Sequence, residues 1–331
     1  MSKQPPIEVP QGAIRLNAES HKLEFYAQDR WHEIASETAS LHNGEVFFTA
    51  GGANKYTQSF NIVTGGTAVN IDVDQLYGIH SPAAVNSKTR GVTMGGRNNP
   101  SPYAEQNVIQ FFEFATKGDY ADFGALTESK VRNSGHGDNT RGISFGRQNG
   151  ASNIIEFITI PSKGNGTDFG DSTVARGMGN AFGNRTRACY AGGNSAGDNF
   201  RNTVDYVTIQ STGNAIDFGD RLHQMYTSGT ACNPVRGLLA GGYGTPNDKR
   251  IELFTIATTG NGVEFGELER GGFGRGGTGS PITALFSSGT SGSTKIEKVA
   301  FATLGDSIDF GDLVESATYG RGMSPAHGGL T

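Results

Sequence analysis

Cysteine, tryptophan and long apolar stretches are all scarce in this chain of 331 residues. It contains two cysteines, Cys189 and Cys232, and a single tryptophan, Trp31. Two cysteines do not make a disulfide framework, so both are interpreted as buried thiols. No stretch approaches 18 consecutive apolar residues, and Met1 to Pro6 carries no apolar signal segment. These absences predict a soluble protein that is made in a cytoplasm.

The chain also lacks a large excess of charge of either sign, because it has 27 basic and 32 acidic residues and a net charge of −5. This balance predicts neither nucleic-acid binding nor membrane insertion. No phosphate-binding Gly-x-x-x-x-Gly-Lys motif and no nucleophile elbow is present, and the seven histidines lack the spacing of metal ligands. We therefore expect no catalytic residues, no metal and no cofactor, and predict that the protein is not an enzyme.

Glycine, by contrast, is abundant, with 50 residues where average usage of about 7% would give roughly 23. A three-residue motif, which we call the phrase, recurs among these glycines. Its copies are Asp122-Phe123-Gly124, Asp168-Phe169-Gly170, Asp217-Phe218-Gly219, Glu264-Phe265-Gly266 and Asp309-Phe310-Gly311, with a divergent first copy at Asn70-Ile71-Asp72. Its central residues are 52, 46, 49, 47 and 45 residues apart. A repeat of about this length indicates a solenoid, a propeller or an array.

Each repeat contains a strand that ends in glycine, an alternating strand, and the strand that carries the phrase. In the third repeat these are residues 141–146, residues 155–160 and the strand around 168–170, and Gly164-Asn165 indicates a turn between the last two. The segment behind the phrase is long enough for a fourth strand. Four short strands per repeat are typical of a propeller blade. The sequence therefore predicts an all-β fold, with a six-bladed β-propeller over residues 41–331.

The ends of the chain predict how this ring closes. The first repeat begins directly with its glycine-terminated strand near residue 44, whereas residues 313–330 resemble the connecting segments between earlier repeats. We expect the C-terminal segment to complete the first blade, which removes an exposed sheet edge. In length and in their paired glycines, the repeats resemble those of kelch-like propellers, although the kelch tryptophan is missing.

Residues 1–40 lie outside the repeats. Strands are expected at 13–17 and 22–26, with a third short piece at 31–34. Because an isolated hairpin is marginally stable in water, this segment is expected to need a partner surface. The candidate docking residues are Ile14, Leu16, Leu23, Phe25, Tyr26 and Trp31.

Two patterns carry a resemblance to viral proteins. Gly12-Ala13-Ile14-Arg15-x-Asn17, followed by Leu23-Glu24-Phe25-Tyr26 and Trp31-x-x-Ile34, resembles a short module of structural proteins of tailed bacteriophages, especially tail fibres. The Asp-Phe-Gly-Asp repeat with Thr-Arg-Gly resembles propeller proteins of marine and cyanobacterial phages. The resemblance implies a virion component that is present in several copies and binds other virion proteins through residues 1–40.

Three series of charged residues recur once per repeat and are interpreted as hydrogen bonds and ion pairs between blades. They contain Asp122, Asp168, Asp217, Glu264 and Asp309; Glu156, Asp205, Glu252 and Glu297; and Arg90, Arg141, Arg187 and Arg236. The variable loops after the glycine pairs are better candidates for binding, because loops on a rigid scaffold commonly carry function. Their candidate ligand-binding residues are Tyr103, Asn194, Asp198, Asn199, Phe200, Tyr243 and Asn247.

The leading hypothesis is a non-enzymatic tail or tail-fibre-type appendage of a virion that contacts a glycan or protein on the host surface. Two alternatives stay open: a capsid decoration protein without a receptor, and an enzyme that acts on surface polysaccharide. The first two differ in where the protein lies in the particle. The enzyme requires a pocket with at least two carboxylates that do not follow the repeat.

Overall fold

The computed structural model describes residues 9–17, 22–33, 44–49, 56–71, 73–98, 103–195, 199–244, 249–289, 293–327 and 329–330. Contacts divide the chain into two compact units, Met1–Ser40 and Leu41–Thr331. Within the described residues the regular structure is β-strand and no α-helix occurs, so none of them forms a helix that could cross a membrane. The prediction of an all-β protein is confirmed.

The smaller unit is an antiparallel meander of three strands, β1 (Ile14–Asn17), β2 (Lys22–Ala27) and β3 (Arg30–Glu33). The first two strands agree with the expected ranges to within one residue. Gln28 and Asp29 form the turn between β2 and β3, and both have positive φ angles, of 49° and 59°.

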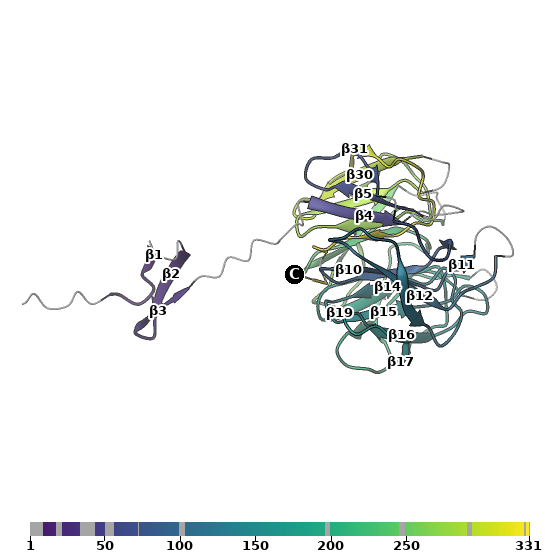
Figure 1. The fold of residues 1–331 in the computed structure, drawn as a ribbon, viewed down its shortest axis with the longest axis horizontal. Helices are drawn as coiled ribbons and strands as arrows, with labels where there is room; N and C mark the ends of the chain where they lie inside the picture. The colour runs from purple at the N-terminus through teal and green to yellow at the C-terminus, as the bar shows by residue number, and fades with distance from the viewer. Residues whose placement is uncertain are drawn as a thin grey trace, which may run out of the picture. The chain divides into compact units, whose positions relative to one another are not determined.

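The larger unit contains six sheets, each built on four antiparallel strands (Figure 1). In sheet order they are β32 (Gly322–Met323), β4 (Glu45–Thr49), β5 (Thr57–Asn61), β7 (Val69–Asn70); β9 (Ala83–Asn86), β10 (Arg90–Met94), β12 (Val108–Glu113), β13 (Ala121–Ala125); β14 (Ser134–Gly137), β15 (Arg141–Phe145), β16 (Ile154–Thr159), β17 (Thr167–Asp171); β18 (Asn180–Gly183), β19 (Arg187–Ala191), β22 (Thr203–Thr208), β23 (Ile216–Asp220); β24 (Gly229–Cys232), β25 (Arg236–Ala240), β26 (Arg250–Thr255), β27 (Val263–Glu267); and β28 (Gly277–Gly279), β29 (Thr283–Ser287), β30 (Lys295–Ala300), β31 (Ile308–Asp312). We number these sheets one to six in that order.

Short strands add to this framework. β6 (Gly66–Thr67) joins the sixth sheet by pairing in parallel with β31, while β8 (Ile79–His80) pairs with β11 (Arg97–Asn98) and β20 (Asn194–Ser195) with β21 (Asn199–Phe200). The pairing of β6 with β31 places the first and last sheets side by side, as Figure 1 also shows.

The first strand of each sheet contacts the first strands of both neighbouring sheets. The order of these contacts is β9, β14, β18, β24, β28, β32 and again β9. We call these six the inner strands. β32 comes from the C-terminal segment and pairs with β4, with Met323 opposite Phe47. The fold is thus propeller-like, and the two ends of the larger unit share one sheet.

The Asp-Phe-Gly phrase forms the joint between adjacent sheets. Phe169 is buried and packs with Val207 and Ile209 of the next sheet, and burying a phenylalanine contributes about 1.5–3 kcal/mol. Gly170 has a φ of 142°, and a Cβ there would lie 2.4 Å from the carbonyl carbon of Gly213. The Gly213 N–H in turn donates to the Phe169 carbonyl at 2.7 Å. Glycine is therefore required where the two backbones touch.

The asparagine that follows this turn strengthens the same joint. Asn214 Oδ1 accepts a hydrogen bond from the Asp171 N–H of the preceding sheet, at 3.0 Å. Equivalent bonds join the other sheets, with Asn165 accepting from Ala125, Asn261 from Asp220 and Asp306 from Glu267. The Gly-Asn turns thus connect sheets in addition to connecting strands.

The arginine series also links sheets, as predicted. Arg141 donates from Nη1 to the Ile209 carbonyl of the next sheet at 3.1 Å, and its guanidinium lies 4.7 Å from the Phe157 ring centroid. Arg90, Arg187 and Arg236 make equivalent bonds to Ile160, Ile256 and Phe301. The aspartates of the phrase differ from these arginines in burial, because Asp122, Asp168 and Asp217 are exposed. Asp309 pairs with Lys295 of its own sheet, so the expected link between sheets is wrong for Asp309.

The remaining series, which contains Glu156, Asp205, Glu252 and Glu297, forms fully buried ion pairs. Each carboxylate lies on the third strand of its sheet, and its cation lies on the connection that enters the same sheet. The pairs are Glu156–Lys130 at 3.0 Å, Asp205–Arg176 at 2.9 Å, Glu252–Arg221 at 2.9 Å and Glu297–Arg275 at 3.3 Å. Gln58 and Gln110 occupy the carboxylate position in the first two sheets; Gln58 Oε1 accepts from the Val314 N–H at 2.6 Å. These pairs bind connections to sheets, rather than one sheet to another as predicted.

The joint between sheets can be tested with two glycine variants. Gly170→Ala is expected to lower the free energy of unfolding by about 1–3 kcal/mol more than Gly213→Ala does. Both glycines have similar φ angles, of 142° and 153°, but a Cβ at Gly213 would meet no atom within 4 Å. Gly213→Ala is thus the control for backbone strain alone. Chemical denaturation measures both values, and equal losses would contradict the steric explanation.

Candidate functional site

Backbone hydrogen bonds join each of the connections that lead into the inner strands to the next one, in an open series. Arg132 N donates to Ser81 O, Met178 N to Arg132 O, Thr227 N to Met178 O, Gly274 N to Thr227 O, and Tyr319 N to Gly274 O, at 2.8–3.0 Å. All six residues have positive φ angles, between 53° and 68°. This shared conformation brings side chains from six connections around a common centre, at the end where the inner strands begin.

Aromatic side chains from some of these connections and from neighbouring loops pack against one another. Successive ring centroids are 5.0 Å apart for Phe200 and Tyr226, 5.1 Å for Tyr226 and Tyr243, 5.1 Å for Tyr243 and Phe273, and 6.2 Å for Phe273 and Tyr319. We call these five residues the aromatic surface. Tyr243 is 45% exposed. Rings held in this way present apolar faces to a ligand with little loss of side-chain entropy on binding.

Arg132 lies beside the aromatic surface, and Arg97 lies beside Tyr103, which is not part of that surface. The Arg132 Cζ lies 4.9 Å from the Tyr319 ring centroid, and the Arg97 Cζ lies 5.2 Å from that of Tyr103. In both arginines the Nε is buried, and the described part of the chain offers it no hydrogen-bond acceptor. Burial, together with the charge of Arg97, lowers the pKa of Arg132. The nearby Tyr319 partly offsets this decrease. Incompletely paired guanidinium groups suit a ligand that carries a carboxylate.

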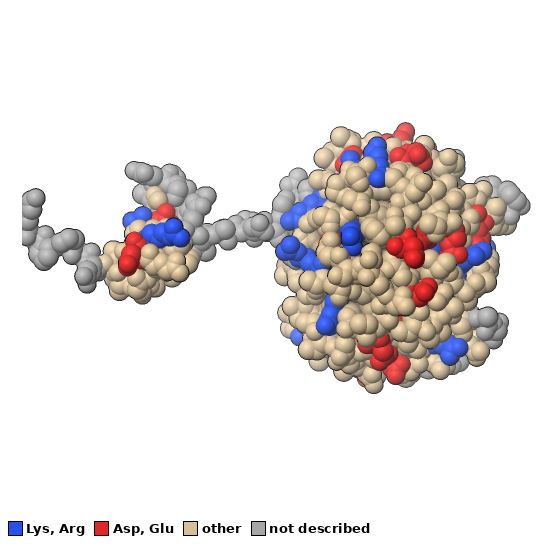
Figure 2. Space-filling view, turned by 90° about the horizontal axis from the view of Figure 1, so that it is seen from below, with Lys and Arg blue, Asp and Glu red and all other residues tan. Residues whose placement is uncertain are grey.

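The acidic residues near this site are already paired. Glu105 accepts from the Arg147 Nε at 3.1 Å, and Glu128 lies 3.6 Å from Arg147 and from Lys130. On the face of the larger unit seen in Figure 2, acidic and basic side chains are scattered among uncharged residues. The site is therefore built from aromatic rings and arginines, with its neighbouring carboxylates engaged in ion pairs.

The structure brings together some of the residues that the sequence predicts for binding. Phe200 and Tyr243 belong to the aromatic surface, and Tyr103 contacts Arg97. Asn194 and Asn199 lie on the hairpin of β20 and β21 that also carries Phe200. Asp198 and Asn247 lie outside the described residues.

Sequence reasoning missed the contribution of the connections. Tyr226, Phe273, Tyr319 and Arg132 come eight or nine residues after the central residue of the repeated phrase. Tyr226 and Phe273 share an offset of eight residues from the phrase, and Arg132 and Tyr319 share an offset of nine, so the sequence contained two adjacent series of equivalent positions. The loops after the glycine pairs supply only part of the site.

The predicted docking residues of the smaller unit divide between the two faces of its sheet. Ile14 pairs with Phe25 and Leu16 with Leu23, and these four side chains form an apolar face that is exposed in this structure. Alternation along the strands places Tyr26 and Trp31 on the opposite face, where their ring centroids are 5.2 Å apart and Arg15 lies over Trp31.

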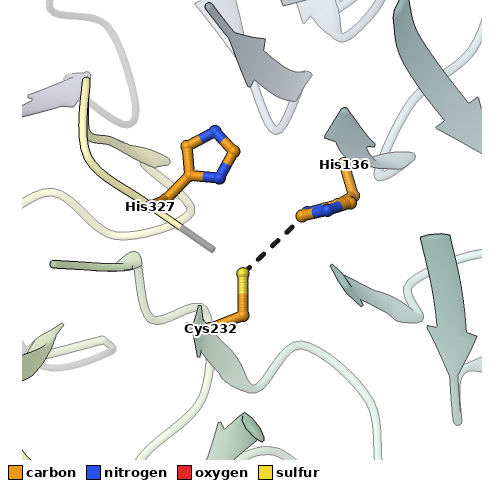
Figure 3. Close-up of side chains that lie close together, drawn as sticks. All are labelled: His136, Cys232 and His327. Carbon is orange, nitrogen blue, oxygen red and sulfur yellow. Dashed lines mark hydrogen bonds between the residues drawn. The ribbon is translucent and has the colours of Figure 1, made fainter. Parts of the chain in front are cut away.

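A second cluster lies at the other end of the inner strands. The histidines lack metal-ligand spacing in the sequence, yet the fold brings the side chains of His136, Cys232 and His327 together, with one potential ligand atom from each lying within 4.8 Å of the others (Figure 3). Cys189 is also buried, and the two cysteines form no disulfide.

His80 gives the aromatic surface a pH-dependent contribution to stability. Its ring lies 4.9 Å from that of Tyr319, and its Nδ1 is 2.8 Å from Ser81 Oγ. Burial, and then the charges of Arg97, Arg132 and Arg321, lowers the pKa of His80 to about 4. An unfolded chain binds a proton at this residue near pH 6.5. Between these pH values only the unfolded state is protonated there, so stability falls as the pH falls.

We therefore expect His80→Gln to flatten the pH dependence of the free energy of unfolding between about pH 6.5 and pH 4. The slope should decrease by up to about 1.4 kcal/mol per pH unit, the contribution of one proton bound only by the unfolded state. Chemical denaturation of parent and variant across this window measures the change. Parallel curves would show that His80 does not titrate in this way.

Comparison with known proteins supports the fold. No family model matches the chain, and no curated protein matches it. Among many similar solved chains, the structure of YjhT has a TM-score of 0.62 and 9% sequence identity, over 74% of this chain and 87% of that one. At this identity the likeness concerns the fold alone, and the chain shares a propeller-like fold with YjhT.

Proposed function

We propose that the six sheets are the blades of a closed six-bladed propeller. The cyclic order of contacts between inner strands supports this arrangement. The pairing of β32 with β4 supports closure within the first blade, because it joins residues that are far apart in the sequence. Such closure leaves no sheet edge open between the first and last blades.

On this scaffold, we propose a non-enzymatic structural protein of a bacteriophage virion, of the tail or tail-fibre type, that binds a glycan on the host surface. The observation that carries the binding role is the aromatic surface with Arg132 beside it, together with Arg97, whose charge acts on Arg132 and which lies over Tyr103. The resemblance of residues 12–34 and of the repeat to phage structural proteins supports the virion role.

The chemistry of the surface favours a saccharide. Sugar rings have apolar faces that stack on aromatic side chains, and their hydroxyl groups hydrogen-bond at the edges of such a platform. Arg97 and Arg132 are each partly exposed, and their positive charges favour a sugar that carries a carboxylate. The proposed ligand is therefore an acidic polysaccharide of the cell envelope.

Attachment to the particle is assigned to the smaller unit. Ile14, Leu16, Leu23 and Phe25 form an apolar face on a sheet of only three short strands. Since so small a sheet has little core of its own, covering this face with a neighbouring virion protein would stabilise it. A density map of the intact particle distinguishes a tail position from a capsid decoration.

Glycan binding can be tested by removing aromatic rings. Tyr243→Ala and Tyr319→Ala are each expected to weaken binding to host cells and to their extracted acidic polysaccharide about tenfold, since a central aromatic contact contributes 1 kcal/mol or more. Ile282→Ala is the control, because Ile282 is 70% exposed and follows the far end of inner strand β28. Retained binding in both tyrosine variants would refute the assigned surface.

Docking is tested by incorporation into particles. A chain without residues 1–40 is expected to keep the circular dichroism spectrum and melting temperature of the larger unit but to be absent from purified virions. The double variant Leu16→Glu/Leu23→Glu should behave in the same way, because it places charges on the apolar face. Ile282→Glu provides a control of equal chemistry on the larger unit. Normal incorporation of the truncated chain would contradict the docking role.

A further inference from the structure

The cluster of His136, Cys232 and His327 is built from alternate inner strands. His136 is the third residue of β14, Cys232 is the last residue of β24, and His327 lies four residues beyond β32. In the cycle of inner strands, one other strand separates each of these three from the next. The three side chains consequently approach a common point from three directions, as Figure 3 shows.

The distances within the cluster are close to those of a metal site. Cys232 Sγ lies 4.0 Å from His136 Nδ1, and the ring centroids of His136 and His327 are 5.6 Å apart. Tetrahedral zinc, with Zn–N of about 2.0–2.1 Å and Zn–S of about 2.3 Å, holds its ligand atoms roughly 3.4–3.7 Å apart. Small side-chain movements are enough to reach that geometry.

Hydrogen bonds to the backbone fix the protonation of both imidazoles. His136 Nε2 lies 3.2 Å from the Asn184 carbonyl, which can only accept, so this nitrogen carries the proton and Nδ1 faces Cys232 with its lone pair. The His327 ring donates to the Asn86 carbonyl and accepts from the Gly329 N–H at Nδ1, at 3.0 Å. The bonds to the Asn184 and Asn86 carbonyls are of the kind that orient metal-binding histidines, whereas the Gly329 N–H occupies the His327 nitrogen that a metal would use.

Burial also keeps both rings in the form that binds metals. It lowers the pKa of His136 to about 4 and that of His327 to about 3, and in His327 the neighbouring His136 adds to the effect. The hydrogen bonds described above also leave each ring with one N–H and one lone pair, which is the neutral form. A metal ion needs neutral imidazoles and a thiolate, so only the Cys232 thiol must lose a proton.

The cavity beside these residues has room for an ion. Its volume is about 50 Å³, and glycines of the inner strands, including Gly135, Gly277 and Gly322, form much of its wall. A water molecule occupies roughly 30 Å³ in the liquid. The space therefore accommodates an ion together with a water molecule as its fourth ligand.

The potential ligands do not follow the repeat. Strand register places Val85, Phe182, Ala231, Thr278 and Met323 at the position of His136, and Asn86, Gly137, Gly183 and Gly279 at that of Cys232. Residues that maintain the blades recur in each sheet, as the arginine series does. The departure from the repeat at these two positions indicates a local role.

We propose that His136, Cys232 and His327 bind one Zn²⁺-class divalent transition-metal ion, with water as the fourth ligand, and that the ion fastens the C-terminal segment to β14 and β24. On binding, the Cys232 thiol releases its proton to solvent and the Gly329 N–H gives up its bond to His327 Nδ1. Two imidazoles and one thiolate match the ligand preference of zinc and cobalt. Because His327 follows β32, the ion would reinforce ring closure.

The full chain, stripped of metal with a chelator and kept reduced, is titrated with Co²⁺ and then with Zn²⁺. We expect a thiolate-to-cobalt charge-transfer band that saturates at one ion per chain and disappears when Zn²⁺ displaces Co²⁺. Zn²⁺ should also raise the melting temperature, because it binds the folded state selectively. Absence of the band and of the thermal shift would overturn the proposal.

Matched variants separate this site from other thiols. Cys232→Ser and His327→Gln are expected to lose the band and the Zn²⁺-dependent thermal shift, whereas Cys189→Ala, which removes the other buried thiol, should keep both. His327 lies outside the strands, so its variant tests the site even if Cys232→Ser fails to fold. A band that persists in His327→Gln, or that depends on Cys189, would overturn the assigned ligands.

Discussion

Close backbone contact between adjacent sheets is the constraint on which the larger unit depends. Each sheet exposes an apolar face that it cannot bury alone, and its neighbour covers that face only if the two backbones approach closely. Gly170 permits this approach to Gly213, while Phe169 fills the interior beside it. The same arrangement recurs at Gly124, Gly219, Gly266 and Gly311. Repetition of one joint, rather than a single central core, therefore sets the angle between neighbouring sheets and brings the last sheet beside the first.

Because the same joint links each sheet to the next, equivalent residues of successive sheets lie around a common centre at both ends of the inner strands. Since successive connections share a positive-φ residue that bonds to the next connection, the residues at this position lie around the same centre whatever their side chains are. Arg132, Thr227 and Tyr319 share this conformation and belong to one series of hydrogen bonds, yet differ in chemistry. Side-chain variation on a constant backbone thus produces an aromatic and cationic surface at one end, and at the other a cluster of two imidazoles and a thiol.

Features that recur at constant spacing could be predicted from the sequence, and features that depend on contacts across the ring could not. The strands and the arginines that link sheets follow the period. The buried cations do not, because they come 7, 7, 3 and 10 residues after the central phenylalanine of the phrase, at Lys130, Arg176, Arg221 and Arg275. Similarly, His136 and Cys232 are 96 residues apart in the chain and meet only because their strands face the same cavity.

The buried ion pairs explain why each of these connections carries a cation, although its position varies. A carboxylate such as Glu252, removed from water and left without Arg221, would cost about 3–5 kcal/mol, whereas the intact pair adds little net stability. Its effect is specificity: a connection that entered the sheet along another path would leave Glu252 unpaired. The connections held in this way are the ones that carry Tyr226, Phe273 and Arg132. The pairs therefore hold the connections that carry Tyr226 and Phe273 of the aromatic surface, and a rigid surface loses less entropy when it binds a ligand.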